Sequence, residues 1–144
     1  MKLITLIIGL LVVGCGTITT EDVIGSYDSD FFGTERLVFQ QNGLVEMYAL
    51  TKGNFLASEL LDKPVKTGTS EWSIVGGRVC LHLPTLTEEE EAEFTAKELK
   101  KRKGAKVFYK RERNGDLITI YIKLKDGKRI YIREEDQLPL IKIK

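Results

Sequence analysis

Only three side chains in this sequence are cysteine or histidine, the usual nucleophiles and transition-metal ligands: Cys15, Cys80 and His82. Cys80 and His82 stand two residues apart in 78–83, a segment typical of a strand, which places them on one face. A thiol nucleophile needs a base beside it, and a zinc site needs three or four ligands. The one histidine that a Cys80 nucleophile could use, His82, is two residues along the same strand, and no second histidine exists to help it form a metal or catalytic site. We therefore expect no catalytic residue, no metal and no cofactor, and we interpret His82 as a half-exposed strand residue.

Cys15 has a different setting, at the end of an apolar run near the amino terminus. Met1 and Lys2 are followed by the run 3–13, then by Gly14 and Cys15. A run of about a dozen residues is shorter than the ~20 that a transmembrane helix needs. The segment resembles the signal peptide and lipobox of bacterial lipoproteins. The resemblance implies cleavage before Cys15, attachment of a diacylglyceryl group to its thiol, and acylation of the new amino terminus, for example with palmitate.

This resemblance divides the chain into a signal peptide (1–14), a lipidated tether (15–22) and a single domain (23–144). An extended tether of this length reaches roughly 25 Å, so the domain is expected to stay near the membrane surface. Gly16 stands where an aspartate would resemble the inner-membrane retention signal of enterobacteria. We therefore expect an envelope protein anchored through Cys15, at the periplasmic face of an outer membrane where one exists.

Charge and cysteine content narrow the class of partner. The chain has 22 basic and 21 acidic side chains, and loss of Lys2 with the signal peptide makes these numbers equal. Such a balance argues against a general nucleic-acid binder, as does export. A lipidated Cys15 also leaves Cys80 without a disulfide partner.

Two charged clusters have both a functional and a structural interpretation. Asp28, Asp30 and Glu35 could form an acidic site, but turns are ordinarily rich in aspartate, and a solvated loop explains them. Nine lysines and arginines lie between Lys97 and Arg113. They could meet anionic head groups of the nearby membrane, or they could form a solvated helix end and an exposed strand.

Turn signals and alternating apolar residues predict three β-hairpins. The first spans 35–50 around Asn42-Gly43, the second spans 71–83 around Gly76-Gly77, and the third follows 117–124 through Asp126-Gly127. The pairs expected to share the apolar faces are Phe39–Val45, Leu37–Met47, Ile74–Val79, Trp72–Leu81, Ile122–Ile130 and Ile120–Ile132. A final strand over 138–144 is expected to begin at a sheet edge because of Pro139.

One surface helix is predicted at about 87–103. Thr87 and Glu90 have the spacing of a capping box, and Gly104 is suited to end the helix. Glutamates crowd its first half and lysines and arginines its second half, which complements the helix dipole.

Together these elements predict a mainly β domain, an antiparallel meander closed into a small barrel or half-barrel with one inserted helix. Gly25-Ser26-Tyr27, followed by the strand of Leu37 and Phe39 and by Trp72 before a glycine turn, resembles small bacterial lipocalin-like domains. That resemblance implies a barrel whose interior can bind a small apolar or lipid-like ligand.

We therefore expect a non-catalytic binding module, with its ligand on the shared apolar face of the strands. The residues expected to contact the ligand are Leu37, Phe39, Met47, Trp72, Leu81 and Ile120. The alternative is a structural or interaction lipoprotein of the envelope, an inhibitor or assembly accessory without a small-molecule ligand. A packed core would use the same apolar residues.

Overall fold

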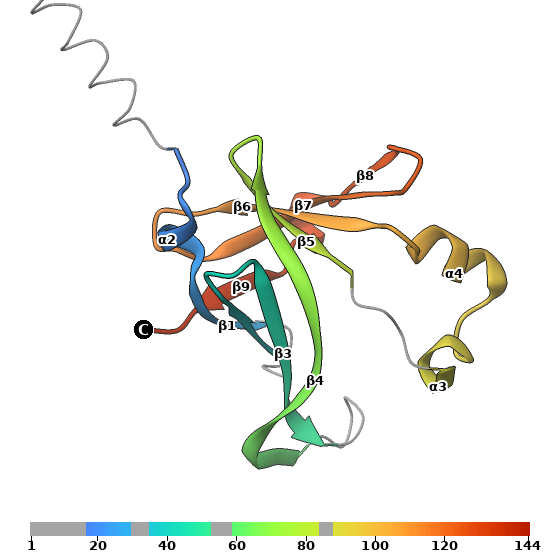
Figure 1. Cartoon of the computed structure of the whole chain (residues 1–144), viewed down its shortest axis with the longest axis horizontal. Helices are drawn as coiled ribbons and strands as arrows, with labels where there is room; N and C mark the ends of the chain where they lie inside the picture. The colour runs from blue at the N-terminus through green and yellow to red at the C-terminus, as the bar shows by residue number, and fades with distance from the viewer. Residues whose placement is uncertain (1–16, 30–34, 53–58, 84–87) are drawn as a thin grey trace, which may run out of the picture.

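The computed structural model describes residues 17–29, 35–52, 59–83 and 88–144, which form a closed antiparallel barrel (Figure 1). Neighbouring strands follow the order β6-β5-β4-β3-β2-β1-β9-β7, and a further pairing of β6 with β7 closes the ring of eight strands. The ring strands are β1 (Gly25–Ser29), β2 (Glu35–Phe39), β3 (Leu44–Lys52), β4 (Glu59–Val75), β5 (Arg78–His82), β6 (Lys106–Arg111), β7 (Leu117–Lys123) and β9 (Pro139–Lys142). The expected mainly β barrel is confirmed.

The three predicted hairpins form in the predicted registers. Each has a turn glycine at positive φ, which a residue with a side chain adopts only with strain. The pairs Phe39–Val45, Leu37–Met47, Ile74–Val79, Trp72–Leu81 and Ile122–Ile130 are all present. The third hairpin carries β8 (Arg129–Tyr131), which pairs only with β7 and lies outside the ring (Figure 1).

The last strand closes the barrel. β9 pairs with β1 on one side and with the first half of β7 on the other. The expectation that it begins at a sheet edge is wrong, because Pro139 lies opposite Ile118 within the ring. A proline is tolerated there because it is the first residue of its strand, where a missing N–H costs little.

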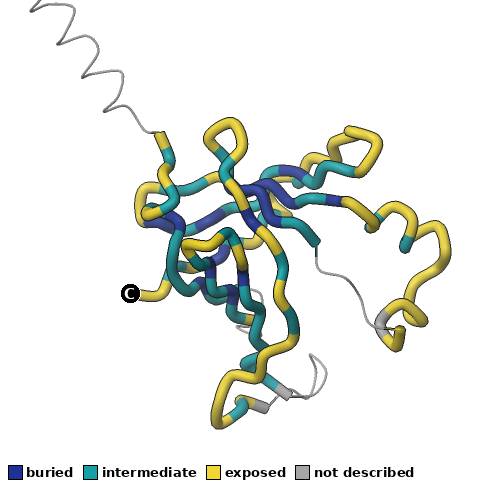
Figure 2. The backbone as a smooth tube through the Cα atoms, viewed as in Figure 1, coloured by how far each residue is buried: buried dark blue, intermediate teal, exposed yellow. Residues whose placement is uncertain are grey.

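The barrel encloses an aromatic and aliphatic core, which Figure 2 shows as buried stretches along the strands. Tyr27, Phe39, Val45, Val79 and Leu117 are at most 1 % exposed. These residues come from five ring strands, and the same cluster includes Trp72 of β4, Tyr109 of β6 and Leu140 of β9, so the core contacts every strand of the ring.

A short helix, α2 (Thr20–Val23), precedes β1 and docks on the barrel. The buried Tyr27 hydroxyl donates a hydrogen bond to the Val23 carbonyl at 2.7 Å, and Lys142 Nζ donates to the Asp22 carbonyl at 2.9 Å. Part of the segment predicted as a tether is therefore held against the domain.

The helical segment lies where it was predicted, but it is divided into α3 (Glu88–Glu91) and α4 (Ala96–Arg102). Thr95 has an extended backbone and caps α4: its hydroxyl accepts from Glu98 N at 3.2 Å, and its own N–H donates to Glu98 Oε2 at 2.7 Å. This capping box starts a new helix and interrupts a continuous one. The predicted cap residue Thr87 lies outside the described residues. α4 ends just before Gly104, as expected.

Candidate functional site

Five of the six residues expected to contact a ligand lie in one inner cluster: Leu37, Phe39, Met47, Trp72 and Leu81. The Phe39 ring lies between those of Tyr27 and Trp72, edge to face, with centroid distances of 5.2 and 5.4 Å. Trp72 Nε1 donates a hydrogen bond to the Gln40 carbonyl at 2.9 Å. These side chains pack against one another, which is how a core is stabilised.

Ile120, the sixth residue, is not brought to the others. It packs beside Cys80, Phe108 and Tyr121 in a second cluster on the other side of the sheet. The cause is a bulge: β6 residues Phe108 and Tyr109 pair with Tyr121 and Thr119, which leaves Ile120 without an opposite residue. The extra residue reverses the alternation along β7, so Leu117 and Ile122 both contact the inner cluster although their numbers differ in parity.

Cys80 and His82 occupy structural positions. Cys80 is 1 % exposed, and burial raises the pKa of its thiol, which keeps it protonated and weakly nucleophilic. His82 is half-buried, and its backbone carbonyl accepts a hydrogen bond from Ser70 Oγ at 2.6 Å. Within the described ranges no three His, Cys, Asp or Glu side chains are grouped closely enough to hold a metal ion. Cys15 lies outside those ranges, as does Asp30 of the acidic cluster. Asp28 pairs with Arg36 at 2.7 Å.

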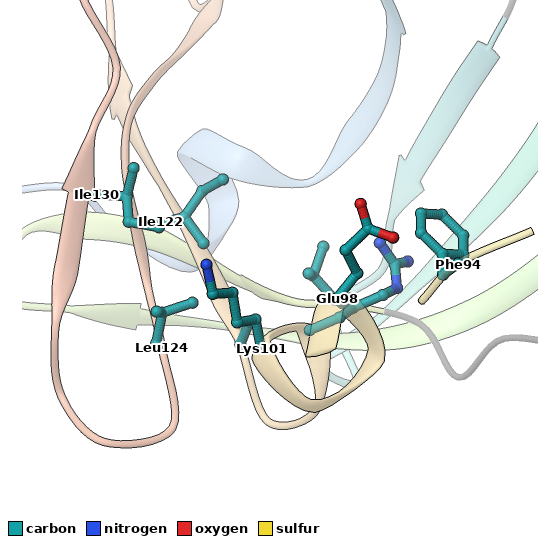
Figure 3. Close-up of a pocket in the computed structure, with 9 residues that line it drawn as sticks. Phe94, Glu98, Lys101, Ile122, Leu124 and Ile130 are labelled. Carbon is teal, nitrogen blue, oxygen red and sulfur yellow. The ribbon is translucent and has the colours of Figure 1, made fainter. Parts of the chain in front are cut away.

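A pocket of about 280 Å³ lies between α4 and the β7–β8 hairpin (Figure 3). Ile122, Leu124 and Ile130 extend from the hairpin towards the side on which α4 presents Glu98 and Lys101. The complete lining comprises Leu83, Phe94, Glu98, Lys101, Arg102, Ala105, Ile122, Leu124 and Ile130. The pocket therefore has an apolar floor and a charged rim.

The pocket exists because α4 does not completely cover the apolar face of the β7–β8 hairpin. Glu98, Lys101 and Arg102 are spaced three and four residues apart, so they share one face of the helix. That face lines the pocket, and no residue of α4 is buried. Ile130 consequently remains 43 % exposed. The apolar surface of the hairpin is thus left partly open under a row of charges.

The charges at the rim are unbalanced. The Thr95 backbone and side chain hold Glu98 in the capping box and lower the pKa of its carboxyl. Lys101 and Arg102 form no ion pair within the part of the chain that the structure describes, and Arg102 Nε is buried without a hydrogen-bond partner. The rim is therefore suited to an anion.

This pocket was not predicted from the sequence, although one cross-strand pair of its lining was. The Ile122–Ile130 pair was predicted, and Ile122 does pack against the inner cluster, but no pocket was expected between this pair and α4. Lys101 and Arg102 were interpreted as part of a helix end that complements the dipole or as part of a basic stretch facing anionic head groups, not as the rim of a pocket. The third hairpin did contain an indication of the pocket, because the apolar face of β7 continues past the barrel to Leu124 and needs a covering surface there.

The basic stretch between Lys97 and Arg113 does not form one surface. Its α4 portion precedes β6, whereas Arg111 ends β6 near Asp22 of α2. Hydrogen bonds from Thr19 are the main cause that lowers the pKa of the Asp22 carboxyl, and the charge of Arg111 adds to the shift. Figure 1 shows α2 and α4 at opposite ends of the barrel. Among the residues whose structure is described, no helix is long and apolar enough to cross a membrane.

Comparison with known proteins gives no relative from which to transfer a function. No protein-family model, no curated protein and no solved structure matches this chain.

Proposed function

We propose that this chain is a lipid-anchored protein of the bacterial envelope whose barrel is a non-catalytic binding module for an amphiphile. The ligand we propose has one acyl chain and an anionic head group, as a fatty acid does. The proposed anchor is supported by the segment 1–15, with its apolar run and terminal cysteine. The proposed ligand is supported by the pocket between α4 and the β7–β8 hairpin.

The floor of the pocket favours a hydrocarbon chain. Ile122, Leu124 and Ile130 form an apolar strip that the domain covers only in part: Ile122 and Leu124 are half-buried and Ile130 is exposed. Burying a methylene group there contributes about 0.8 kcal/mol. A volume of about 280 Å³ lies near the lower end of the range of roughly 300–1,000 Å³ for ligand pockets. This size suits one acyl segment better than a diacyl lipid.

The rim favours a carboxylate or phosphate at the end of that chain. Lys101 and Arg102 line the pocket beside the apolar floor. At this rim the Lys101 ammonium and the Arg102 guanidinium would donate charge-assisted hydrogen bonds to an oxyanion. The arrangement of apolar floor and cationic rim is the observation that carries the proposal.

Photocrosslinking of the full-length protein in nanodiscs tests the ligand. The probe is a photoreactive analogue of lauric acid, and labelled peptides are identified by mass spectrometry. We expect labelling of peptides that contain Leu124 or Ile130, and a several-fold loss in Arg102→Gln and Ile130→Ser. Lys100→Gln is the matched control, because Lys100 is on α4 but does not line the pocket. Equal labelling in Arg102→Gln and Lys100→Gln would contradict the proposal, as would a methyl ester probe that labels as well as the acid.

The densely packed inner cluster favours one alternative, a structural or interaction protein of the envelope. In that case the barrel binds no small ligand, and its packed core provides a stable scaffold whose outer surface contacts another envelope protein. Failure of the acid probe to label the pocket, together with recovery of a stable envelope partner in a pull-down, would favour this alternative.

A further inference from the structure

The β7–β8 hairpin has a second face that differs in chemistry from the first. Strand alternation places Ile122 and Ile130 towards α4, and it places the cross-strand pair Tyr121 and Tyr131 on the opposite face. Arg129 joins the two tyrosines there. Because β8 lies outside the ring, both faces of the hairpin reach the surface of the molecule (Figure 1).

A second groove of about 280 Å³ lies on this tyrosine face. Its lining includes Ile120 and Tyr121 of β7, Arg129 and Tyr131 of β8, and two residues from other parts of the chain. These are Arg78, which follows the Gly76-Gly77 turn, and Gln137, which precedes β9. Three separate segments therefore converge on one polar and aromatic groove.

The aromatic groups of the groove are held in place by contacts beneath them. The Tyr121 ring stacks on Phe108 with centroids 4.7 Å apart, and the Arg129 guanidinium lies 4.7 Å from the centroid of the Tyr121 ring. Tyr131 lies 5.4 Å from Tyr121 and is 66 % exposed. A guanidinium stacked in this way keeps the N–H donors at its edge available for an oxyanion. The exposed Tyr131 ring offers a flat apolar face beside it.

The groove carries uncompensated positive charge. Arg78 and Arg129 form no ion pair with any residue that the structure describes. The nearby carboxylates of Glu135 and Asp136 pair with Arg133, at 3.6 and 2.9 Å. A hydrogen bond with Tyr131 raises the pKa of Arg129, so its charge is fixed at any physiological pH. An anionic ligand in the groove therefore meets two arginines that form no ion pair with a described residue.

We infer that this groove binds a sugar ring that carries a carboxylate or a phosphate. The flat face of a pyranose packs on the exposed Tyr131 ring, the oxyanion is held by Arg129 and Arg78, and the Gln137 amide can hydrogen-bond to ring hydroxyls. The site is separate from the acyl pocket, since the two share no lining residue. It does not depend on the proposed fatty-acid ligand.

Isothermal titration calorimetry on the full chain, in a detergent without sugar head groups, tests this inference. The ligands are glucuronate, glucose-6-phosphate, neutral glucose and inorganic phosphate. We expect at least one of the two sugar anions to bind about tenfold or more tightly than glucose and than inorganic phosphate. Which of the two binds identifies carboxylate or phosphate as the recognised group.

Variants then assign the binding to the groove. Arg129→Gln and Tyr131→Ala are each expected to weaken it about tenfold or more, with an unchanged circular dichroism spectrum, because both residues are exposed. Lys128→Gln is the matched control, because Lys128 is an exposed cation next to Arg129 that does not line the groove. The inference is overturned by absence of binding up to about 10 mM of either sugar anion, where millimolar affinities are detected. Equal affinity for glucose or for inorganic phosphate also overturns it, as does an unchanged affinity in both groove variants.

Discussion

Among single residues, Phe39 contributes most clearly to holding the barrel together. It is 1 % exposed and touches the rings of Tyr27 and Trp72, which belong to β1 and β4. Phe39→Ala should therefore lower the free energy of unfolding by about 3–5 kcal/mol, through lost burial and the cavity left behind. Urea unfolding measures the change. Leu60→Ala is the control, because Leu60 is 83 % exposed and its removal should matter little. A loss below about 1 kcal/mol for Phe39→Ala would contradict a packed interior.

Tyr27 links stability to alkaline pH. Burial is the main reason why the pKa of its hydroxyl rises from 10.0 to about 12. An acid whose pKa is higher in the folded state contributes stability that is complete below pH 10 and is lost as pH rises to about 12. Loss of its hydrogen bond to Val23 should make Tyr27→Phe less stable than wild type at pH 8 by about 1 kcal/mol.

The difference in unfolding free energy between wild type and Tyr27→Phe should narrow as pH rises from 10 towards 12, because only the wild type carries the Tyr27 hydroxyl that ionises on unfolding. Urea unfolding of both proteins across the range measures it, and the other titrating groups, Tyr109 included, are common to both. A constant difference in unfolding free energy would show that Tyr27 does not ionise on unfolding as proposed.

At the scale of elements, α4 depends on its own cap more than on packing, since none of its residues is buried. Thr95→Ala should remove about 1 kcal/mol from the helix. The Leu99 amide, which donates to the Thr95 carbonyl at 3.0 Å, and the Lys103 amide, which donates to the Leu99 carbonyl at 3.0 Å, should exchange roughly fivefold faster with deuterium. Thr69→Ala, in β4, should leave both amides unchanged.

Acid should have the same effect on α4 as the loss of its cap. Hydrogen bonds to Thr95 lower the pKa of Glu98 below 4.5. The ionised Glu98 carboxyl therefore contributes to the stability of α4 above pH 4.5, and this contribution disappears as pH falls through the lowered pKa. Exchange rates that do not respond to Thr95→Ala would show that tertiary contacts, rather than the capping box, fix α4.

Elements whose structure depends on residues close to one another in the sequence were predicted correctly. The registers of the three hairpins follow from turn residues and alternation within about ten residues, and both are visible in the sequence. The bulge at Ile120 depends on how β6 meets β7, and no pattern within β7 shows it. The pocket and the tyrosine groove were missed for the same reason. Each combines the hairpin with α4, with Arg78 or with Gln137, which come from other parts of the chain.

For the whole molecule, the proposed anchor predicts where the protein is found. Cys15→Ser removes the thiol that would receive the diacylglyceryl group, so the uncleaved precursor should accumulate without lipid. Metabolic labelling with palmitate followed by detergent phase partitioning compares the variant with wild type. Cys80→Ser is the control and should still be labelled, since Cys80 is buried in the barrel wall. A wild-type protein that takes up no palmitate and partitions into the aqueous phase would contradict the lipoprotein proposal.

Ring closure by β9 also determines when this chain can finish folding. The partner of β1 on one side is formed by Pro139–Lys142, the ring strand that comes latest in chain order. Until they emerge, β1 and the first half of β7 each keep an unpaired edge, and edges of this kind invite association with other strands. Contacts between the two ends of a chain also form slowly. The ring therefore cannot close before β9 has left the ribosome, and a chain that lacks this strand can still be threaded through a narrow channel.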